Sequence, residues 1–335
     1  MDSKVIVDYK KAIAKWVGTD ESIYLYWKAR VGLFAYLKAL NIGEGDEVIM
    51  PAFTCVVVPN AVIYLGATPI YVDVEPDTYN ASAQSIIRKI TKKTKVIVCQ
   101  NTFGLSSDIE TVVEYCNKRK IQTIEDCAHG FGGSYDNQPN GSMCEAAIFS
   151  TQWNKPYSTG LGGILVVRNK ELSNKVQIAN KDLQSPAVTD LFLLSIQLFA
   201  RRYIMTQRNY WFLLKLFRWM SKKRIVIGSS DPLEIQSTET PNGYFRGFSA
   251  LQAKVGLRSI AQLSDNISER KRIATCYTEY LISKNKNHVA FRLFSNHCFL
   301  KYPLLVKNRE KFNKIAEDSN AVSYTHLTLP TIYSV

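Results

Sequence analysis

Two side chains of opposite charge follow neighbouring β-rich runs in the first half of the chain. Asp126 ends the run IQTIED, and Lys155 lies in the loop after the run AAIFS, which Ser150 ends. If both runs are strands of a doubly wound sheet, their ends meet at the edge where such sheets bind ligands. This pairing suits pyridoxal 5'-phosphate (PLP), because a lysine amine can form a Schiff base with its aldehyde while a buried aspartate keeps its ring nitrogen protonated.

Each of these residues also has an ordinary structural interpretation. An aspartate after a strand is typical of a helix cap or a turn, and a loop lysine is typically solvated. Gly160, Gly162 and Gly163 by themselves indicate only a tight turn into the next strand. The residue pattern alone therefore predicts an enzyme-like α/β domain and leaves its reaction open.

Short apolar runs alternate with helix-like segments between Val48 and Val167. Runs of this length, rich in β-branched residues and separated by segments such as Asp108 to Lys118, favour buried parallel strands with helical crossovers. The runs are EVIMP (47–51), TPIYVDV (68–74), KVIVCQN (95–101), IQTIED (121–126), AAIFS (146–150) and GILVV (163–167). Residues 1–184 are therefore predicted to form a large, ligand-binding α/β domain.

Residues 185–240 interrupt this pattern with an aromatic and basic insert. Its longest uncharged run, Leu191 to Ala200, is shorter than the about 20 residues that span a bilayer. The insert is predicted to form one or two helices that pack against the body or a second subunit. The alternative is an interfacial helix pair, within 185–224, whose cations face anionic lipid. Those cations are Arg201, Arg202, Lys215, Arg218, Lys222, Lys223 and Arg224.

The remaining residues predict a smaller C-terminal domain of the α+β class. Phe248 to Leu281 has a helical pattern, and residues 290–318 are expected to add two short strands and a helix, so that 241–321 forms a partial domain. Residues 322–335 resemble the translation of a sequencing adaptor. We expect them to be an artefactual tail that replaces the natural C-terminus.

Composition and charge restrict the classes of partner that are expected. The formal charge of +13 suits anionic ligands such as nucleotides or an acidic membrane surface. No nucleic-acid motif accompanies this charge, so no nucleic-acid partner is expected. The seven cysteines form no CxxC pair, which predicts reduced thiols and no metal site. The first residues lack the order of a signal peptide, which predicts a cytoplasmic protein.

Several segments, in order, resemble the DegT/DnrJ/EryC1/StrS aminotransferases. The resemblance covers roughly residues 25–320 and is weakest in the insert. The segments are GDEVIMPAFTCVVVPNAVIYLGATPIYVDVEPDTYN (45–80), KVIVCQNTFGLSSDIE (95–110), IEDCAHGFGG (124–133), FSTQWNKPYSTGLGG (149–163), FSALQAKVGLRSI (248–260) and KRIATCYTEYL (271–281).

This resemblance implies a fold-type-I PLP enzyme. Such enzymes are usually homodimers with active sites at the subunit interface, and they transfer an amino group from glutamate to a nucleotide-linked keto sugar for cell-surface polysaccharide synthesis. Lys155 matches the Schiff-base lysine and Asp126 the partner of the pyridine nitrogen. His129 falls near the cofactor's phenolic oxygen, and Ser150 matches a phosphate-binding serine.

Other positions depart from the family pattern. Ala29 and Arg30 occupy the turn whose backbone amides hold the phosphate, where Arg30 would replace a hydroxyl with a cation. Cys55 stands where many members stack an aromatic ring on the cofactor, and Leu161 replaces an acidic residue. Phe245-Arg246-Gly247 replaces the Asn-Tyr-Arg that reaches the partner subunit.

These departures keep two alternatives open. One is a PLP enzyme with another acceptor, or a dehydrase, although the family's dehydratases carry histidine where Lys155 stands. The other is a non-catalytic membrane-surface or regulatory protein on the same fold.

Overall fold

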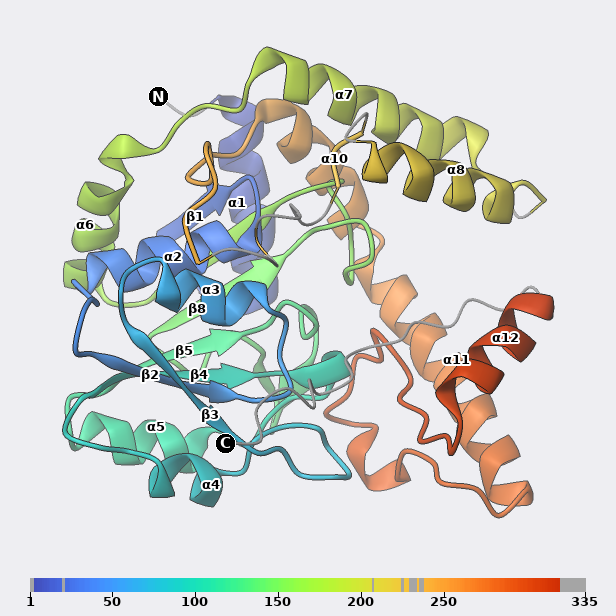
Figure 1. Cartoon of the computed structure of the whole chain (residues 1–335), viewed down its shortest axis with the longest axis horizontal. Coiled ribbons are helices and arrows are strands. Elements are labelled where there is room, and N and C mark those ends of the chain that lie inside the picture. The colour runs from blue at the N-terminus through green and yellow to red at the C-terminus, as the bar shows by residue number, and fades with distance from the viewer. Residues whose placement is uncertain are drawn as a thin grey trace.

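The computed structural model describes residues 3–19, 22–206, 208–223, 226–228, 234 and 238–319. A seven-stranded sheet lies at its centre, in the order β1-β9-β8-β5-β4-β2-β3 (Figure 1). The strands are β1 (Ser22–Tyr26), β2 (Glu47–Pro51), β3 (Thr68–Val72), β4 (Thr94–Gln100), β5 (Gln122–Asp126), β8 (Ala146–Ser150) and β9 (Gly163–Val167). β3, β2, β4, β5 and β8 pair in parallel, whereas β9 is antiparallel to both β8 and β1.

Helices cover both faces of the sheet because alternate strand residues point to opposite sides. Ala146 and Ile148 of β8 pack with α2 (Ala29–Ala39), α3 (Val57–Ile63) and α6 (Lys170–Ala179). Ala147 and Phe149 of the same strand pack on the other face. The helices of that face are α1 (Lys4–Val17), α4 (Ala83–Arg88), α5 (Glu110–Asn117) and α10 (Ala250–Ile260).

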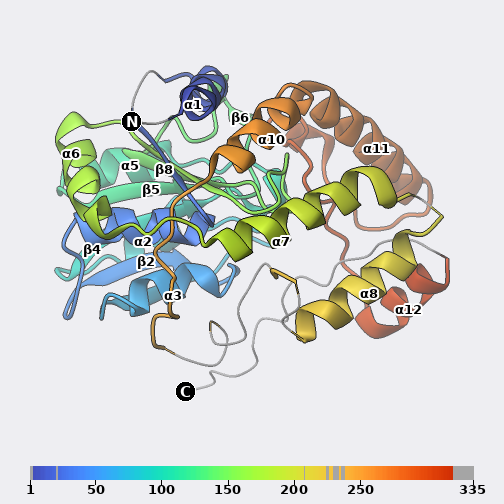
Figure 2. The same ribbon diagram turned by 90° about the horizontal axis from the view of Figure 1, so that it is seen from above.

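The remaining elements lie outside this three-layered body. α7 (Val188–Phe199), a π-helical turn (Ala200–Ile204) and α8 (Tyr210–Lys222) follow the body along one edge, and α7 lies between α10 and α8 in Figure 2. α11 (Leu263–Ser283) continues from α10 away from the sheet (Figure 1). α12 (Arg309–Asp318) lies beside α8 (Figure 2). Short pieces complete the chain: β6 (Ser134–Tyr135), β7 (Gln138–Pro139) and 3-10 turns at Thr102–Gly104, Asn180–Asp182 and Phe291–Leu293.

The predicted α/β class with a mostly parallel sheet is confirmed. β2, β8 and β9 have the bounds expected for them, but β9 runs antiparallel and β1 was not predicted. The reason for the direction of β9 is its connection to β8. A parallel return needs a crossover, usually a helix, and residues 151–162 contain none.

Of two expectations for the C-terminal part, one is confirmed and one was wrong. The helical pattern from Phe248 to Leu281 forms two helices, α10 and α11, which Ala261 and Gln262 separate. Within the described range 238–319, residues 290–308 form no strand pair but a 3-10 turn and one bridge between His297 and Leu105. The division into domains at 184, 240 and 321 stays a prediction, and residues 322–335 lie outside the described residues.

None of the helices that the structure describes is both long and apolar enough to cross a bilayer. The same part of the chain holds no cluster of three His, Cys, Asp or Glu side chains suited to a metal ion.

Candidate active site

The carboxyl ends of β5 and β8 place the first predicted residues together. Asp126 is the last residue of β5 and Ser150 the last of β8, and both are buried. The two strands run in parallel, and Asp126 pairs with Ile148. The Ala128 N–H donates a hydrogen bond of 2.9 Å to Asp126 Oδ1, which fixes the carboxylate at the end of its strand.

Lys155 lies in the loop 151–162, close to this carboxylate. The loop is closed by its own contacts, because the Thr159 N–H donates to the Thr151 carbonyl at 2.9 Å and the two threonine hydroxyls lie 2.7 Å apart. Arg270 of α11 donates to the Pro156 carbonyl at 3.0 Å and holds the loop from outside. The Lys155 ammonium and the Asp126 carboxylate lie near enough to attract each other, without forming an ion pair within 4.0 Å.

Burial shifts both members of this pair toward their neutral forms. It lowers the pKa of the Lys155 ammonium, and the attraction of Asp126 opposes this shift. It raises the pKa of the Asp126 carboxyl, against the Ala128 hydrogen bond and the charge of Lys155. A lysine that loses its proton more readily is the better nucleophile.

His129 lies close to Lys155, and its ring is neutral. Burial, then the charges of Lys155 and Lys301, hold the pKa of His129 well below its usual value. Its Nδ1 accepts a hydrogen bond of 3.2 Å from the Phe103 N–H, so the proton is on Nε2. The ring also stacks on Phe103, with centroids 6.4 Å apart and planes 8° from parallel. Phe103, in the loop after β4, therefore fixes the orientation of the His129 ring.

The N-terminus of α2 forms the other end of the site. Ala29 begins the helix and lies against Gly163, where an added Cβ would be 2.4 Å from the Ala29 nitrogen. Arg30 is buried, and its guanidinium forms an ion pair with Glu234, whose backbone carbonyl accepts a hydrogen bond from Asn60. Arg30 therefore already has a carboxylate partner where the sequence predicts a phosphate.

Lys301 is a second lysine at the site, which the sequence did not reveal. Burial, with the charge of Lys155, lowers the pKa of Lys301 to about 7, and the thiol of Cys55 opposes the shift. Its backbone N–H donates to the Phe103 carbonyl at 3.2 Å, and the Cys298 N–H to the Gly104 carbonyl at 2.8 Å. A contact between residues about 200 positions apart leaves no local pattern, so no sequence signal could have found it.

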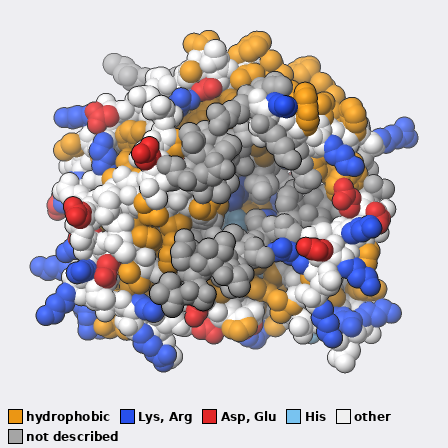
Figure 3. Space-filling view, in the orientation of Figure 1, with side chains coloured by type: hydrophobic (Ala, Val, Ile, Leu, Met, Phe, Trp, Pro, Cys, Tyr) orange, Lys and Arg blue, Asp and Glu red, His pale blue; other side chains and the backbone are white. Residues whose placement is uncertain are grey.

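Three aromatic side chains, which we call the aromatic wall, pack on one another next to the ring of His129. Cys55, nearby in the sequence, is exposed. The rings of Phe53, Tyr79 and Phe103 contact one another, with centroids 5.3–5.8 Å apart. Tyr79 and Phe103 hold left-handed backbone angles, with φ of 58° and 57°. Figure 3 shows a hollow near the centre of this face of the molecule, with basic and histidine side chains within it.

This arrangement fits PLP at one end better than at the other. Lys155, Asp126 and neutral His129 supply an amine, a buried carboxylate and a ring N–H, which suit the aldehyde, the pyridine nitrogen and the phenolic oxygen. At the opposite end, Ser150 and the start of α2 remain suitable for a phosphate. The pairing of Arg30 with Glu234 weakens the cationic contribution expected there.

The chain resembles known proteins along most of its length. A GDP-perosamine synthase of Escherichia coli O157:H7 is 42% identical over 145 residues, which are 43% of this chain and 40% of that protein. A GDP-perosamine synthase of Caulobacter vibrioides is 27% identical over 303 residues, which are 89% of this chain and 68% of that protein. The match to the first relative thus spans well under half of its length.

A solved structure shows the same fold. DesV of S. venezuelae, in complex with a ketimine intermediate, superposes with a TM-score of 0.73 at 20% identity and covers 97% of this chain and 75% of its own. This likeness confirms the predicted fold-type-I architecture.

A family model matches residues 3–330. The match runs through most of residues 322–335, so the expectation that this stretch is foreign and replaces the natural C-terminus is not borne out. The chain belongs to the DegT/DnrJ/EryC1/StrS aminotransferase family.

Proposed function

We propose that this protein is a PLP-dependent aminotransferase that moves an amino group from glutamate to a nucleotide-linked keto sugar, for cell-surface polysaccharide synthesis. One observation supports the proposal most: Lys155, in the loop after β8, is close enough to the buried Asp126 at the end of β5 for the two charges to attract each other. The family membership and the names of the two GDP-perosamine synthases support the nucleotide-linked sugar as acceptor.

Three side chains would carry the chemistry. When bound, PLP would supply an electron sink that weakens the Cα–H bond of an amino acid. Lys155, with its lowered pKa, would attach the aldehyde and then move a proton between carbons. Asp126, as a buried carboxylate, would keep the pyridine nitrogen protonated, and that positive charge would oppose the burial that raises the pKa of Asp126. Neutral His129 would donate Nε2–H to the phenolic oxygen.

The other site residues would position the cofactor. Ser150 and the backbone at Ala29 would bind the phosphate, with Arg30 contributing if Glu234 yields to the anion. Cys55, next to Lys155 and Lys301, would contact the ring where relatives carry an aromatic side chain.

We also propose that the enzyme is a cytoplasmic homodimer. The family resemblance supports this, although Arg246, in the segment expected to reach the partner, pairs with Asp190 of its own chain. Light scattering during gel filtration tests the assembly, and a single-chain mass would contradict it. The predicted domain division at 184, 240 and 321 is retained as part of the proposal.

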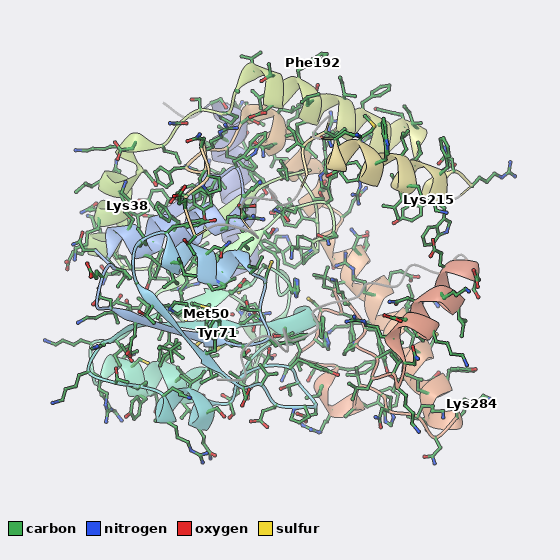
Figure 4. All side chains as sticks on the ribbon, viewed as in Figure 1. Lys38, Met50, Tyr71, Phe192, Lys215 and Lys284 are labelled. Atoms are coloured by element: carbon green, nitrogen blue, oxygen red, sulfur yellow. The ribbon has the colours of Figure 1, made fainter. Side chains whose placement is uncertain are left out.

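The decisive experiment adds PLP to the purified protein and reduces it with borohydride. Lys155 should carry a covalent pyridoxyl group in peptide mass spectra, and glutamate should change the cofactor's absorbance before reduction. Lys155→Ala should lose both the label and transfer to a keto sugar. Lys284→Ala, on an exposed lysine at the far end of α11, is the matched control and should keep both (Figure 4).

The outcomes separate the alternatives. A label on Lys155 without a glutamate-dependent change in absorbance favours a different reaction on the same cofactor. Absence of any label refutes PLP chemistry and favours a non-catalytic protein on this fold.

A further inference from the structure

Helix α7 has two apolar faces, and only one packs against the body. The inner face includes the buried Leu194, which packs with Trp27 and Leu161 and lies against Gly160 of the Lys155 loop. The outer side chains repeat every three or four residues and so share one side of the helix. They are Val188 (82% exposed), Phe192 (64%), Ile196 (49%), Phe199 (58%) and, in the next turn, Tyr203 (64%).

Helix α8 presents a second stripe of the same kind. Phe212 (68% exposed), Leu216 (39%) and Trp219 (55%) follow the same spacing. Together with the outer side chains of α7, they form what we call the α7/α8 face. Figures 1 and 2 show both helices along one edge of the molecule, and Figure 4 shows Phe192 pointing outward. Large exposed apolar surfaces of this kind mark interaction sites.

Cations flank this face almost without acids. Residues 185–224 contain eight Lys and Arg but one acidic residue, Asp190, which pairs with Arg246. Lys215 of α8 (Figure 4) lies 4.0 Å from Glu317 of α12. Among the side chains of this segment that the structure describes, the exposed cations are Arg201, Arg202, Arg208, Lys215 and Lys223.

We propose that the α7/α8 face binds the surface of an anionic lipid bilayer. Aromatic and aliphatic side chains would enter the boundary between headgroups and acyl chains, while the flanking cations would bind lipid phosphates. Neither helix is long enough to cross a bilayer, so the contact lies in the plane of the surface.

Charge favours lipid over a second copy of the chain. A two-fold axis through this face would set it against itself and so bring together two copies of its exposed cations, among them Arg201, Arg202 and Arg208. Because α7 rests on Gly160 and Leu161 of the Lys155 loop, binding there would hold the active-site loop close to the membrane. The inference does not depend on the proposed reaction.

Vesicle flotation of the full-length protein tests this proposal. We expect the protein to float with vesicles of phosphatidylcholine and phosphatidylglycerol, to remain behind with phosphatidylcholine alone, and to release as salt is raised. Replacing two exposed cations, Arg202→Glu with Lys215→Glu, should weaken binding by about tenfold or more. Phe192→Ser with Trp219→Ser should also abolish flotation.

Control variants change similar side chains elsewhere. Ile178→Ser, on a residue of α6 that is 61% exposed, and Lys284→Glu on α11 should float as the unmodified protein does. Circular dichroism checks that each variant is folded. Failure of the unmodified protein to bind anionic vesicles overturns the proposal, as does unchanged binding by both patch variants. If the Phe192 and Trp219 variant instead separates a dimer into single chains, the face is a subunit interface and the proposal is wrong.

Discussion

Two lysine side chains lie close to each other at the site, and one of them lies close to the buried Asp126 carboxylate. Lys155 and Lys301 repel each other, and Asp126 attracts Lys155. Burial makes each charge more costly than it would be in water. The places of Lys155 and Asp126 could be anticipated from the sequence, since each lies at or after the end of a recognisable strand. Lys301 and Glu234 could not, because long-range packing alone brings them to the site.

Replacing Lys301 with methionine should stabilise the cofactor-free protein in a pH-dependent way. Below pH 7 the lysine is charged in both folded and unfolded states, so the cost of burying the charge is fully present. Between about 7 and the usual 10.5 the folded state has released its proton while the unfolded state has not, so native stability rises with pH. We expect Lys301→Met to gain about 1 kcal/mol at pH 6, a modest value because the side chain is partly exposed and screened.

Urea unfolding at pH 6 and pH 10 measures this difference, which should shrink at the higher pH. Lys284→Met, on an exposed lysine, provides the control and should differ little from the unmodified protein at either pH. An equal gain at both pH values would show that Lys301 acts through packing rather than charge.

Replacing Glu234 with glutamine tests the phosphate end of the site. The change leaves the buried Arg30 without this carboxylate and should cost the free protein about 3 kcal/mol. Phosphate or PLP should then restore more stability in Glu234→Gln than in the unmodified protein, because the anion takes the place of the carboxylate. Melting temperatures in phosphate and in chloride of equal ionic strength measure the effect.

The matched control is Glu171→Gln, which breaks an exposed pair with Lys175 of 2.8 Å and should change little. The same phosphate response in Glu234→Gln and the unmodified protein would place the anion elsewhere.

The site depends on where strands end and how they are joined. Apolar runs predicted β2, β8 and β9 because each is short, buried and bounded by turn residues. Strand direction has no such local signal. It depends on the connection, and the helix-free loop 151–162 turns β9 back along β8. This hairpin brings Gly163, at the start of β9, against Ala29 at the start of α2.

Adding a methyl group at Gly163 should separate these elements. Its Cβ would lie 2.4 Å from backbone atoms of Ala29, which cannot move without shifting α2. We expect Gly163→Ala to destabilise the protein by about 2–3 kcal/mol and to weaken PLP binding, as measured by urea unfolding and fluorescence titration. Gly43→Ala, whose nearest neighbour would be 3.6 Å away, is the control and should unfold like the unmodified protein.

At the scale of the whole molecule, the C-terminal part reaches the site through one segment. Residues 297–301 lie against the loop after β4, joined by the His297–Leu105 bridge and the hydrogen bond from Cys298 to Gly104. The sequence analysis predicted two short strands within residues 290–318. The structure shows a single bridge, since Leu105 lies beyond β4 and offers no extended edge.

The lack of a side chain at Gly104 lets residues 297–301 pack against the loop after β4. An added Cβ would lie 2.7 Å from Cys298 Sγ, and φ of 98° already disfavours any other residue. Gly104→Ala should therefore weaken the contact of residues 297–301 with the loop after β4. Amide exchange in these residues should accelerate about tenfold for each 1.4 kcal/mol by which the free energy of opening this contact falls. Gly66→Ala has a similar φ of 81° but no neighbour closer than 3.7 Å, so it controls for backbone strain. Equal exchange in both variants would mean that the contact with Cys298 contributes nothing.

The left-handed backbones of Tyr79 and Phe103 have a consequence for the speed of binding. Holding two aromatic residues in this conformation costs about 1–3 kcal/mol each, and this cost is met when the chain folds, before any ligand arrives. The aromatic wall and the ring of His129 that stacks on it would then need no rearrangement during association. Ligand entry would be a single step, with an observed rate that rises linearly with concentration and shows no plateau.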